Sequence, residues 1–127
     1  AEAGVRQVAG AHTTREIVAH IGGWTDVIRR RVTGEAAEEP GEGDWQVFGE
    51  TTDQDWRAGV ATVRARYDAL VAAIDTLDER SLDKPVTPGG SSVYATLHGA
   101  VQHAIYHAGQ IAILKKAAAT SASGATA

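Results

Sequence analysis

"WRAGVATVRARYDALVAAIDTL", residues 56–77, is the stretch that decides the fold. Its apolar side chains recur at alternating intervals of four and three residues, at Trp56, Val60, Val63, Tyr67, Leu70, Ile74 and Leu77. An α-helix brings such positions onto one face, and this spacing is typical of the seam along which a helix packs in a bundle. The stretch therefore predicts a long helix in an all-α fold.

A second helical pattern precedes this one. Thr13 and Glu16 have the spacing of a capping box, in which a threonine and a glutamate bind the first free amides of a helix. Apolar residues then recur with a helical period as far as Val32, and Gly34 follows as a stop signal. The pair Gly22-Gly23 within this helix predicts close packing against a neighbour.

The two long helices are separated by residues 34–50, which are rich in Gly, Glu and Pro and carry no period. Trp45 and Phe48 in this loop are expected to fold back as a lid or plug over one end of the core. A second loop over residues 83–92 leads into a third helix, predicted over about residues 92–116. No strand-like alternation of useful length and no internal repeat is present.

At 127 residues the chain is expected to form one domain. We divide it into an N-terminal segment (1–12), a helical bundle domain (13–117) and a tail rich in Ala and Ser (118–127). Alanines at the start of the tail favour extension of the third helix, after which the chain is expected to fray.

Composition excludes several classes of function. The net charge of −4 argues against a nucleic-acid partner, and Arg29, Arg30 and Arg31 fit a helix end, where cations suit the helix dipole. Without cysteine there can be no disulfide, thiolate metal site or cysteine nucleophile. No apolar run of about 18 residues exists, so no membrane partner is expected. These features predict a cytoplasmic protein.

Three histidines are predicted to face the interior of the bundle. On a helical wheel, His103 and His107 share one stripe with Gln110, and His20 shares the apolar stripe of the first helix with Trp24. A histidine that points inward is commonly a hydrogen-bonded core residue. Spacing alone therefore leaves two interpretations open, core packing or a metal site.

Metal chemistry suits this set of side chains. Two imidazoles one helical turn apart can bind one divalent ion, and a third from another helix would leave positions open for water or substrate. Imidazole nitrogen suits zinc, nickel and similar metals. "HAIYH" has alanine where the zinc-protease motif HExxH has its glutamate, so that chemistry is excluded. Glu16, one turn before His20, is either a partner of an imidazole or only the capping-box acid.

Three stretches, in order, resemble the DinB-like family of metal-binding helical proteins. They are "HTTREIVAHIGGWTDVIRRRVTGE" (12–35), with an inward histidine four residues before a tryptophan; the tryptophan-containing loop that leads into "RYDALVAAIDTLDERSLDKPV" (66–86); and "YATLHGAVQHAIYHAGQIAILKK" (94–116), with an HxxxHxGQ core. Together they span roughly residues 10–117, and the last is the most specific.

The resemblance implies a four-helix bundle that holds one divalent metal on His20, His103 and His107, and we expect this ion to be zinc or nickel. Gln110 matches the family's glutamine, and with Trp24 and Glu16 it is expected beside the ligands or the pocket. Family members begin with one further long helix, for which residues 1–12 are too short. This chain is therefore either truncated or completed by another subunit, and we expect a homodimer because family members often are dimers.

Three hypotheses for function follow. In the first, the protein is a metal-dependent transferase or hydrolase that uses a low-molecular-weight thiol or metal-bound water on a small-molecule substrate. In the second, it is a non-enzymatic stress-response dimer, stabilised by metal, that binds a small ligand or a protein. In the third, the histidines are hydrogen-bonded core residues without a metal. No catalytic acid or base is identified beyond the proposed ligands.

Overall fold

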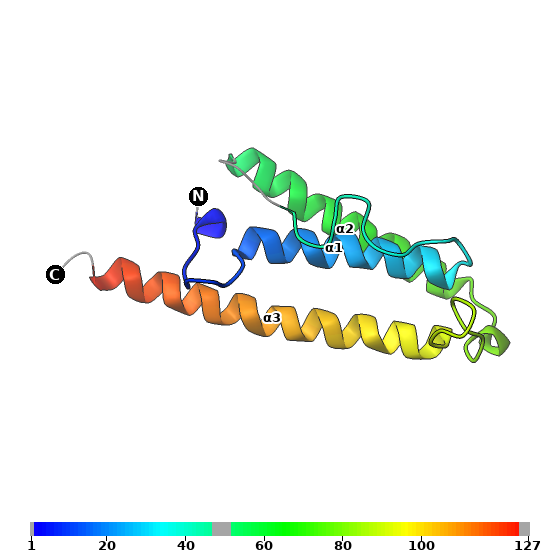
Figure 1. Cartoon of the computed structure of the whole chain (residues 1–127). Helices are drawn as coiled ribbons and strands as arrows, with labels where there is room; N and C mark the ends of the chain where they lie inside the picture. Colours follow the sequence, from blue (N-terminus) through cyan, green and yellow to red (C-terminus); the bar gives the residue numbers. More distant parts are fainter. Residues whose placement is uncertain (1, 47–51, 125–127) are drawn as a thin grey trace.

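The computed structural model describes residues 2–46 and 52–124, and their regular structure is helical (Figure 1). In chain order the elements are the 3₁₀ helix η1 (Glu2–Gly4), α1 (Thr14–Val32), α2 (Asp53–Asp75), the 3₁₀ helix η2 (Glu79–Ser81) and α3 (Val93–Gly124). Within these ranges, β-type pairing is limited to an isolated bridge between Pro85 and Ser92. The predicted all-α fold with three long helices is confirmed.

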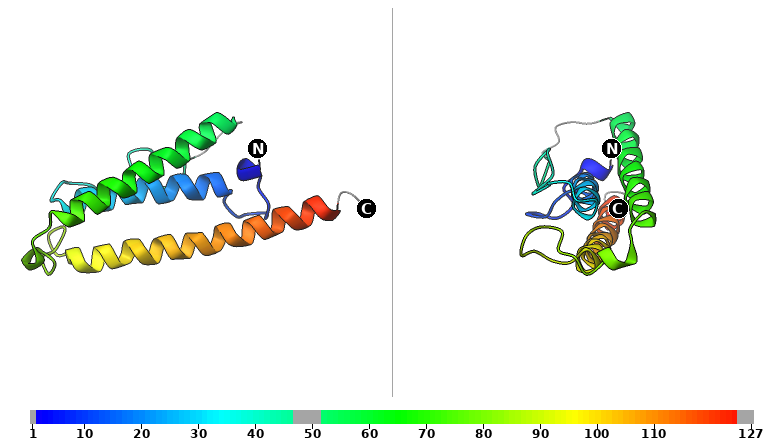
Figure 2. Two further views of the ribbon diagram at one scale, coloured as in Figure 1. Left: turned by 180° about the vertical axis from the view of Figure 1, so that it is seen from behind. Right: turned by 90° about the vertical axis from the view of Figure 1, so that its right-hand side faces the viewer.

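The central element is α1, which packs against both α2 and α3. Figure 2 shows α2 and α3 close to each other near their connection through η2 and diverging toward the opposite end of the bundle. The N-terminal segment lies at that opposite end, beside the first turn of α1 (Figure 1). The bundle is therefore closed at one end and open at the other.

Hydrogen-bonded caps determine where α1 and α2 begin. The Glu16 amide donates to the Thr13 hydroxyl at 3.1 Å, and the Thr13 amide donates to the Glu16 carboxylate at 2.6 Å, which confirms the predicted capping box. The same arrangement of Thr52 and Asp55 begins α2. After the end of α1, Gly34 has a φ of 84°, the left-handed conformation in which glycine commonly stops a helix.

The core lies at the closed end. Ile28, Val32, Leu70 and Val93 form its buried cluster, and partly buried apolar residues pack around it, namely Leu77, Leu82, Val86, Leu97 and Ala100. Each buried side chain of this size contributes about 1.5–3 kcal/mol through removal from water. This cluster joins all three long helices, so it fixes the position of α3 relative to α1.

Two glycines let α1 approach its neighbours closely. A Cβ atom added to Gly22 would lie 2.8 Å from Cγ2 of Val63 in α2. A Cβ atom added to Gly23 would lie 3.0 Å from Cβ of Pro40 in the loop after α1. The predicted close packing at this pair is confirmed, with α2 at one glycine and the loop at the other.

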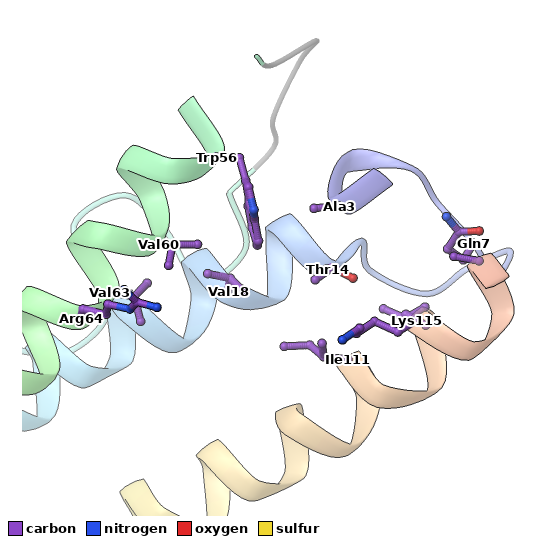
Figure 3. A pocket seen from close by; sticks show the side chains of 12 residues that line it. Ala3, Gln7, Thr14, Val18, Trp56, Val60, Val63, Arg64, Ile111 and Lys115 are labelled. Atoms are coloured by element: carbon purple, nitrogen blue, oxygen red, sulfur yellow. The ribbon is translucent and has the colours of Figure 1, made fainter. Parts of the chain in front are cut away.

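An open groove of about 590 Å³ lies between the diverging ends of α2 and α3 (Figure 3). Its lining is mainly apolar and includes Val18, Trp56, Val60, Val63, Ile111 and Leu114. Trp56, Val60 and Val63 belong to the seam over residues 56–77, of which Leu70 is the buried member and Ile74 is 38% exposed. The seam is therefore covered only in part by the helices of this chain.

The third helix continues past residue 116, as the alanines at the start of the tail predicted. In the structure α3 continues to Gly124, so much of the predicted tail over residues 118–127 is helical. Residues 117–119 are alanines, the strongest helix formers, and Ala118 is buried against the bundle. Although α3 has 32 residues, no helix of the described ranges combines the length and apolar character needed to cross a membrane.

We expect the substitution Gly22→Leu to destabilise the protein by about 1–3 kcal/mol, because the new side chain would overlap Val63. Gly59→Leu is the matched control, since a Cβ atom at this glycine of α2 meets no atom within 4 Å. The control should gain up to about 1 kcal/mol from helix propensity. Urea unfolding measures both, and equal midpoints would contradict the close approach of α1 and α2.

Candidate metal centre

The packing of α1 against α3 brings the three predicted histidines into one cluster. The Nε2 atoms of His20 and His103 lie 2.9 Å apart, and those of His103 and His107 lie 3.1 Å apart. His20 and His107 are only 7% and 4% exposed, and His103 is half-buried. One ligand nitrogen from each ring lies within 4.8 Å of the others, so the group could hold a metal ion.

The second ring nitrogens of two of these histidines face oxygen atoms. Nδ1 of His20 lies 2.8 Å from the backbone carbonyl oxygen of Asp44, and Nδ1 of His107 lies 2.6 Å from Oε1 of Gln110. Because a carbonyl oxygen only accepts, each Nδ1 must carry the ring proton. Each Nε2 then presents a lone pair to the cluster, which is how outer hydrogen bonds orient histidines for metal binding.

The cluster therefore contains more lone pairs than protons that can pair with them. Nε2 of His20 and Nε2 of His107 both face Nε2 of His103, whose one proton can satisfy only one of them. A divalent cation accepts all three lone pairs. Zinc–nitrogen bonds of about 2.0–2.1 Å in tetrahedral geometry separate nitrogens by roughly 3.3 Å, close to the 2.9 and 3.1 Å found here. The residues fit a metal ion.

Burial keeps two of these imidazoles neutral. It lowers the pKa of His103 to about 4, and the neighbouring rings of His107 and His20 lower it as well, whereas Asp44 acts in the opposite direction. Burial is also the main cause that lowers the pKa of His107, against which the hydrogen bond to Gln110 acts. Since only neutral imidazole binds a metal, these shifts favour the ligand form at neutral pH.

Aromatic rings cover the cluster. Trp45 stacks on His20 with ring centroids 4.0 Å apart, and His12 stacks on Trp45 with centroids 3.5 Å apart. The expected folding back of the loop after α1 is thus confirmed for Trp45, but its ring lies on the histidine cluster and not over an end of the core. Leu82 and Val86, which follow η2, pack against the core cluster instead. Phe48, the other residue of that expectation, lies outside the described residues.

A cleft of about 520 Å³ opens beside the cluster. The polar and aromatic side chains of its lining come from α1 (His20, Trp24 and Arg31), from α3 (Thr96 and His103) and from the loops (Asp44 and Ser91). Two of the three histidines therefore line a space that a small molecule can enter. The arrangement combines a potential metal site with room for a ligand.

The family model described as the DinB superfamily matches residues 1–111. This chain belongs to the DinB superfamily. The match covers most of the chain, includes the positions of all three clustered histidines, and confirms the family resemblance noted in the sequence. No curated protein and no solved structure matches the chain.

In this DinB superfamily protein, the three residues expected beside the metal ligands, Gln110, Trp24 and Glu16, have different partners. Gln110 binds His107 directly, while the indole nitrogen of Trp24 donates to the Asp44 carboxylate at 2.7 Å. Glu16 forms no hydrogen bond or ion pair with the three imidazoles. Its carboxylate binds the amide at the start of α1 and an arginine side chain, and it lies 3.7 Å from His12. Its position corresponds to the capping-box role.

Two residues of the site were not identified from the sequence. Asp44 orients His20 through its backbone carbonyl and lies 24 positions away in a loop without a period. His12, which stacks on Trp45 and lies 3.7 Å from the Glu16 carboxylate, precedes the first helix. A backbone contact carries no side-chain signature, so no motif could have pointed to Asp44. For His12, the sole signal was its place directly before the capping box.

We expect Gln110→Ala to weaken zinc binding about 10–100-fold, because Nδ1 of His107 would lose the acceptor that orients the ring. Gln102→Ala is the matched control, since it removes an exposed glutamine from the same helix. Competition with a chromophoric chelator measures both affinities. The orienting role of Gln110 would be refuted by two variants that bind zinc equally well.

Proposed function

We propose that this DinB superfamily protein binds one divalent cation, zinc or nickel, through His20, His103 and His107. The main support for the proposal is the convergence of three Nε2 atoms. In two of the three rings, those of His20 and His107, the Nδ1 proton points away from the cluster toward an oxygen. A set of three imidazoles leaves coordination positions open, as in catalytic and not structural zinc sites. The cleft beside His20 and His103 lies where a ligand would reach these positions.

We infer further that the protein is a metal-dependent transferase or hydrolase acting with a low-molecular-weight thiol or with water. A divalent cation, when bound, lowers the pKa of a coordinated thiol or water molecule. Asp44 and Gln110 hold two ligands in the orientation that this requires, and Trp45 covers the His20 ring. Because the chain has no cysteine, a reacting thiol would come from a co-substrate.

A cytoplasmic location is part of the same proposal. Low-molecular-weight thiols are kept reduced in the cytosol, and only the reduced form can act as a nucleophile. The chain contributes no cysteine that would depend on an oxidising compartment.

The alternative is a non-enzymatic protein that is stabilised by its metal and binds a small ligand or another protein. What favours it is the scarcity of acid–base groups near the cluster. Asp44 carries the sole carboxylate among the described residues that line the cleft. Its Oδ1 already accepts a hydrogen bond from the indole of Trp24 and lies 3.3 Å from Nδ1 of His20.

Protein purified without an affinity tag should contain about one divalent ion per chain, and His107→Ala should lose most of it, because two imidazoles bind far more weakly than three. His98→Ala is the matched control on the same helix, since this exposed ring contacts Tyr94 and not the cluster. Elemental analysis of folded samples measures the ion. Metal-free wild type, or full retention in His107→Ala, would contradict the site.

Activity separates the enzyme from the alternative. Metal-loaded wild type should accelerate the conjugation of a small thiol to an electrophile, or the hydrolysis of an activated ester, and His107→Ala should lose this rate. The assay covers several thiols, including glutathione, and follows product formation with and without added chelator. Inactivity of the loaded wild type toward all combinations would favour the binding function while leaving the metal site in place.

We also propose that the protein forms a homodimer through α3. From Val93 to Leu114 this helix contains no Asp, Glu, Lys or Arg. Tyr94, Val101 and Ile105 are nevertheless 55%, 59% and 67% exposed in the single chain. Contiguous exposed apolar surface of this kind marks protein–protein contacts.

The order of residues along α3 favours a second copy as the partner. At helical spacing, Tyr94, Val101, Ile105, Ala108 and Ala112 lie along one stripe. Bulky side chains precede Ile105 and small ones follow it. An antiparallel pair of α3 helices centred on Ile105 would therefore place bulky side chains against small ones on both sides of a two-fold axis.

Ile105→Lys should convert the dimer to a monomer, because the two-fold axis would bring two like charges together in an apolar contact. Val71→Lys is the control on α2, where the replaced apolar side chain is 55% exposed, compared with 67% for Ile105. Sedimentation velocity measures the mass of each. A monomeric wild type, or a monomeric Val71→Lys, would contradict dimerisation through α3.

A further inference from the structure

Of the three consecutive arginines Arg29, Arg30 and Arg31, the last lacks an acidic partner among the described residues. The neighbouring arginines form ion pairs, Arg29 with Asp26 at 3.1 Å and Glu35 at 2.9 Å, and Arg30 with Glu35 at 3.6 Å. Among the described residues, no carboxylate lies within ion-pair distance of Arg31. Arg31 instead lines the cleft that also contains His20 and His103.

Backbone groups hold the Arg31 side chain in place. Its Nε donates to the carbonyl oxygen of Ala37 at 2.7 Å, and one terminal nitrogen donates to the carbonyl oxygen of Glu38. The guanidinium carbon lies 5.8 Å from the centroid of the Trp24 ring. These contacts orient the group without neutralising its charge. A cation fixed in this way loses little side-chain entropy when it binds an anion.

Two hydroxyl groups line the same cleft without a partner. The side chains of Ser91 and Thr96 make no hydrogen bond within the described part of the chain. The rest of the lining near them is small or apolar, with Ile28, Ala95 and Gly99. Two hydroxyl donors and a guanidinium without an acidic partner form a suitable environment for a carboxylate. The same cleft also holds His20, His103 and Asp44, and the Asp44 carboxylate already accepts a hydrogen bond from Trp24.

We propose that Arg31, assisted by Ser91 and Thr96, binds a carboxylate of the ligand whose reacting end lies at the histidine cluster. This inference rests on the proposed function, since it concerns the ligand of the same cleft. Guanidinium and carboxylate match in a bidentate geometry that an ammonium group does not offer. The substrate class is therefore an anionic, extended thiol or acceptor.

The length of the ligand follows from α1. Arg31 comes eleven residues after His20, which is roughly 16 Å along the helix at about 1.5 Å per residue. The long Arg31 side chain can shorten this span by several ångströms. A tripeptide thiol extends about 10 Å and has the required reach. A two-carbon thiol acid does not.

The test uses the cobalt-substituted full-length protein, in which a coordinated thiolate produces an absorption band. The probes are glutathione, its diethyl ester and mercaptoacetate. Glutathione should bind at least about tenfold more tightly than the ester, because the ester lacks the anionic groups. The carboxylate of mercaptoacetate should not raise its affinity, because the molecule is too short to reach Arg31.

Three variants assign the effect to the cleft. Arg31→Gln should abolish the preference for glutathione over the ester, and Thr96→Val should reduce it. Arg30→Gln is the matched control, since Arg30 also anchors the loop, through the carbonyl oxygen of Ala36 at 2.7 Å, but does not line the cleft. It should keep the full preference. All variants should bind cobalt as wild type does.

The outcomes separate the two proposals. A thiolate band with every probe but equal affinities for glutathione and its ester would overturn the Arg31 subsite and leave the thiol function standing. Equal loss of the preference in Arg30→Gln and Arg31→Gln would also overturn the subsite, because the effect would then come from the loop anchor. Absence of the band with all probes would overturn both the thiol function and the subsite.

Discussion

In the middle of α1, nearly every residue packs against a different neighbour, and the rest of the structure depends on this constraint. His20 faces α3, Gly22 admits α2, Gly23 admits the following loop, and Trp24 binds the loop residue Asp44. A larger side chain at either glycine would displace α2 or the loop. Displacement of the loop would also move the Asp44 carbonyl that orients His20. Packing and site geometry are thus coupled within five consecutive positions.

Local features of the sequence were sufficient to predict the helices. The capping box at Thr13 and the seam over residues 56–77 are signals confined to a few turns, and both correspond to what the structure contains. Extension of α3 through the alanines after residue 116 was predictable from helix propensity, but its end at Gly124 was not, because burial of Ala118 depends on the neighbouring helices. A tertiary contact of that kind cannot be inferred from the helix alone.

The candidate site likewise contains residues that the sequence predicts and others that it does not. Helical spacing turned His103 and His107 toward one side of α3, and the inward stripe of α1 supplied His20, so the convergence of the three rings was predictable. The carbonyl of Asp44 was not, because any residue can offer a backbone oxygen and the loop has no period. Membership of the DinB superfamily agrees with the histidine pattern but adds nothing about Asp44. Only the folded loop reveals it.

The ring stack of His12, Trp45 and His20 joins three separate parts of the chain, the segment before α1, the loop after it and α1 itself. One side of the histidine cluster is therefore covered by the rings of His12 and Trp45, which lie outside the helices, while the side toward α3 opens to the cleft. Opening of this stack requires local movement of the loop without unfolding of a helix. The stack therefore closes the route past Trp45, and the cleft is the route by which a small molecule can reach His20 and His103.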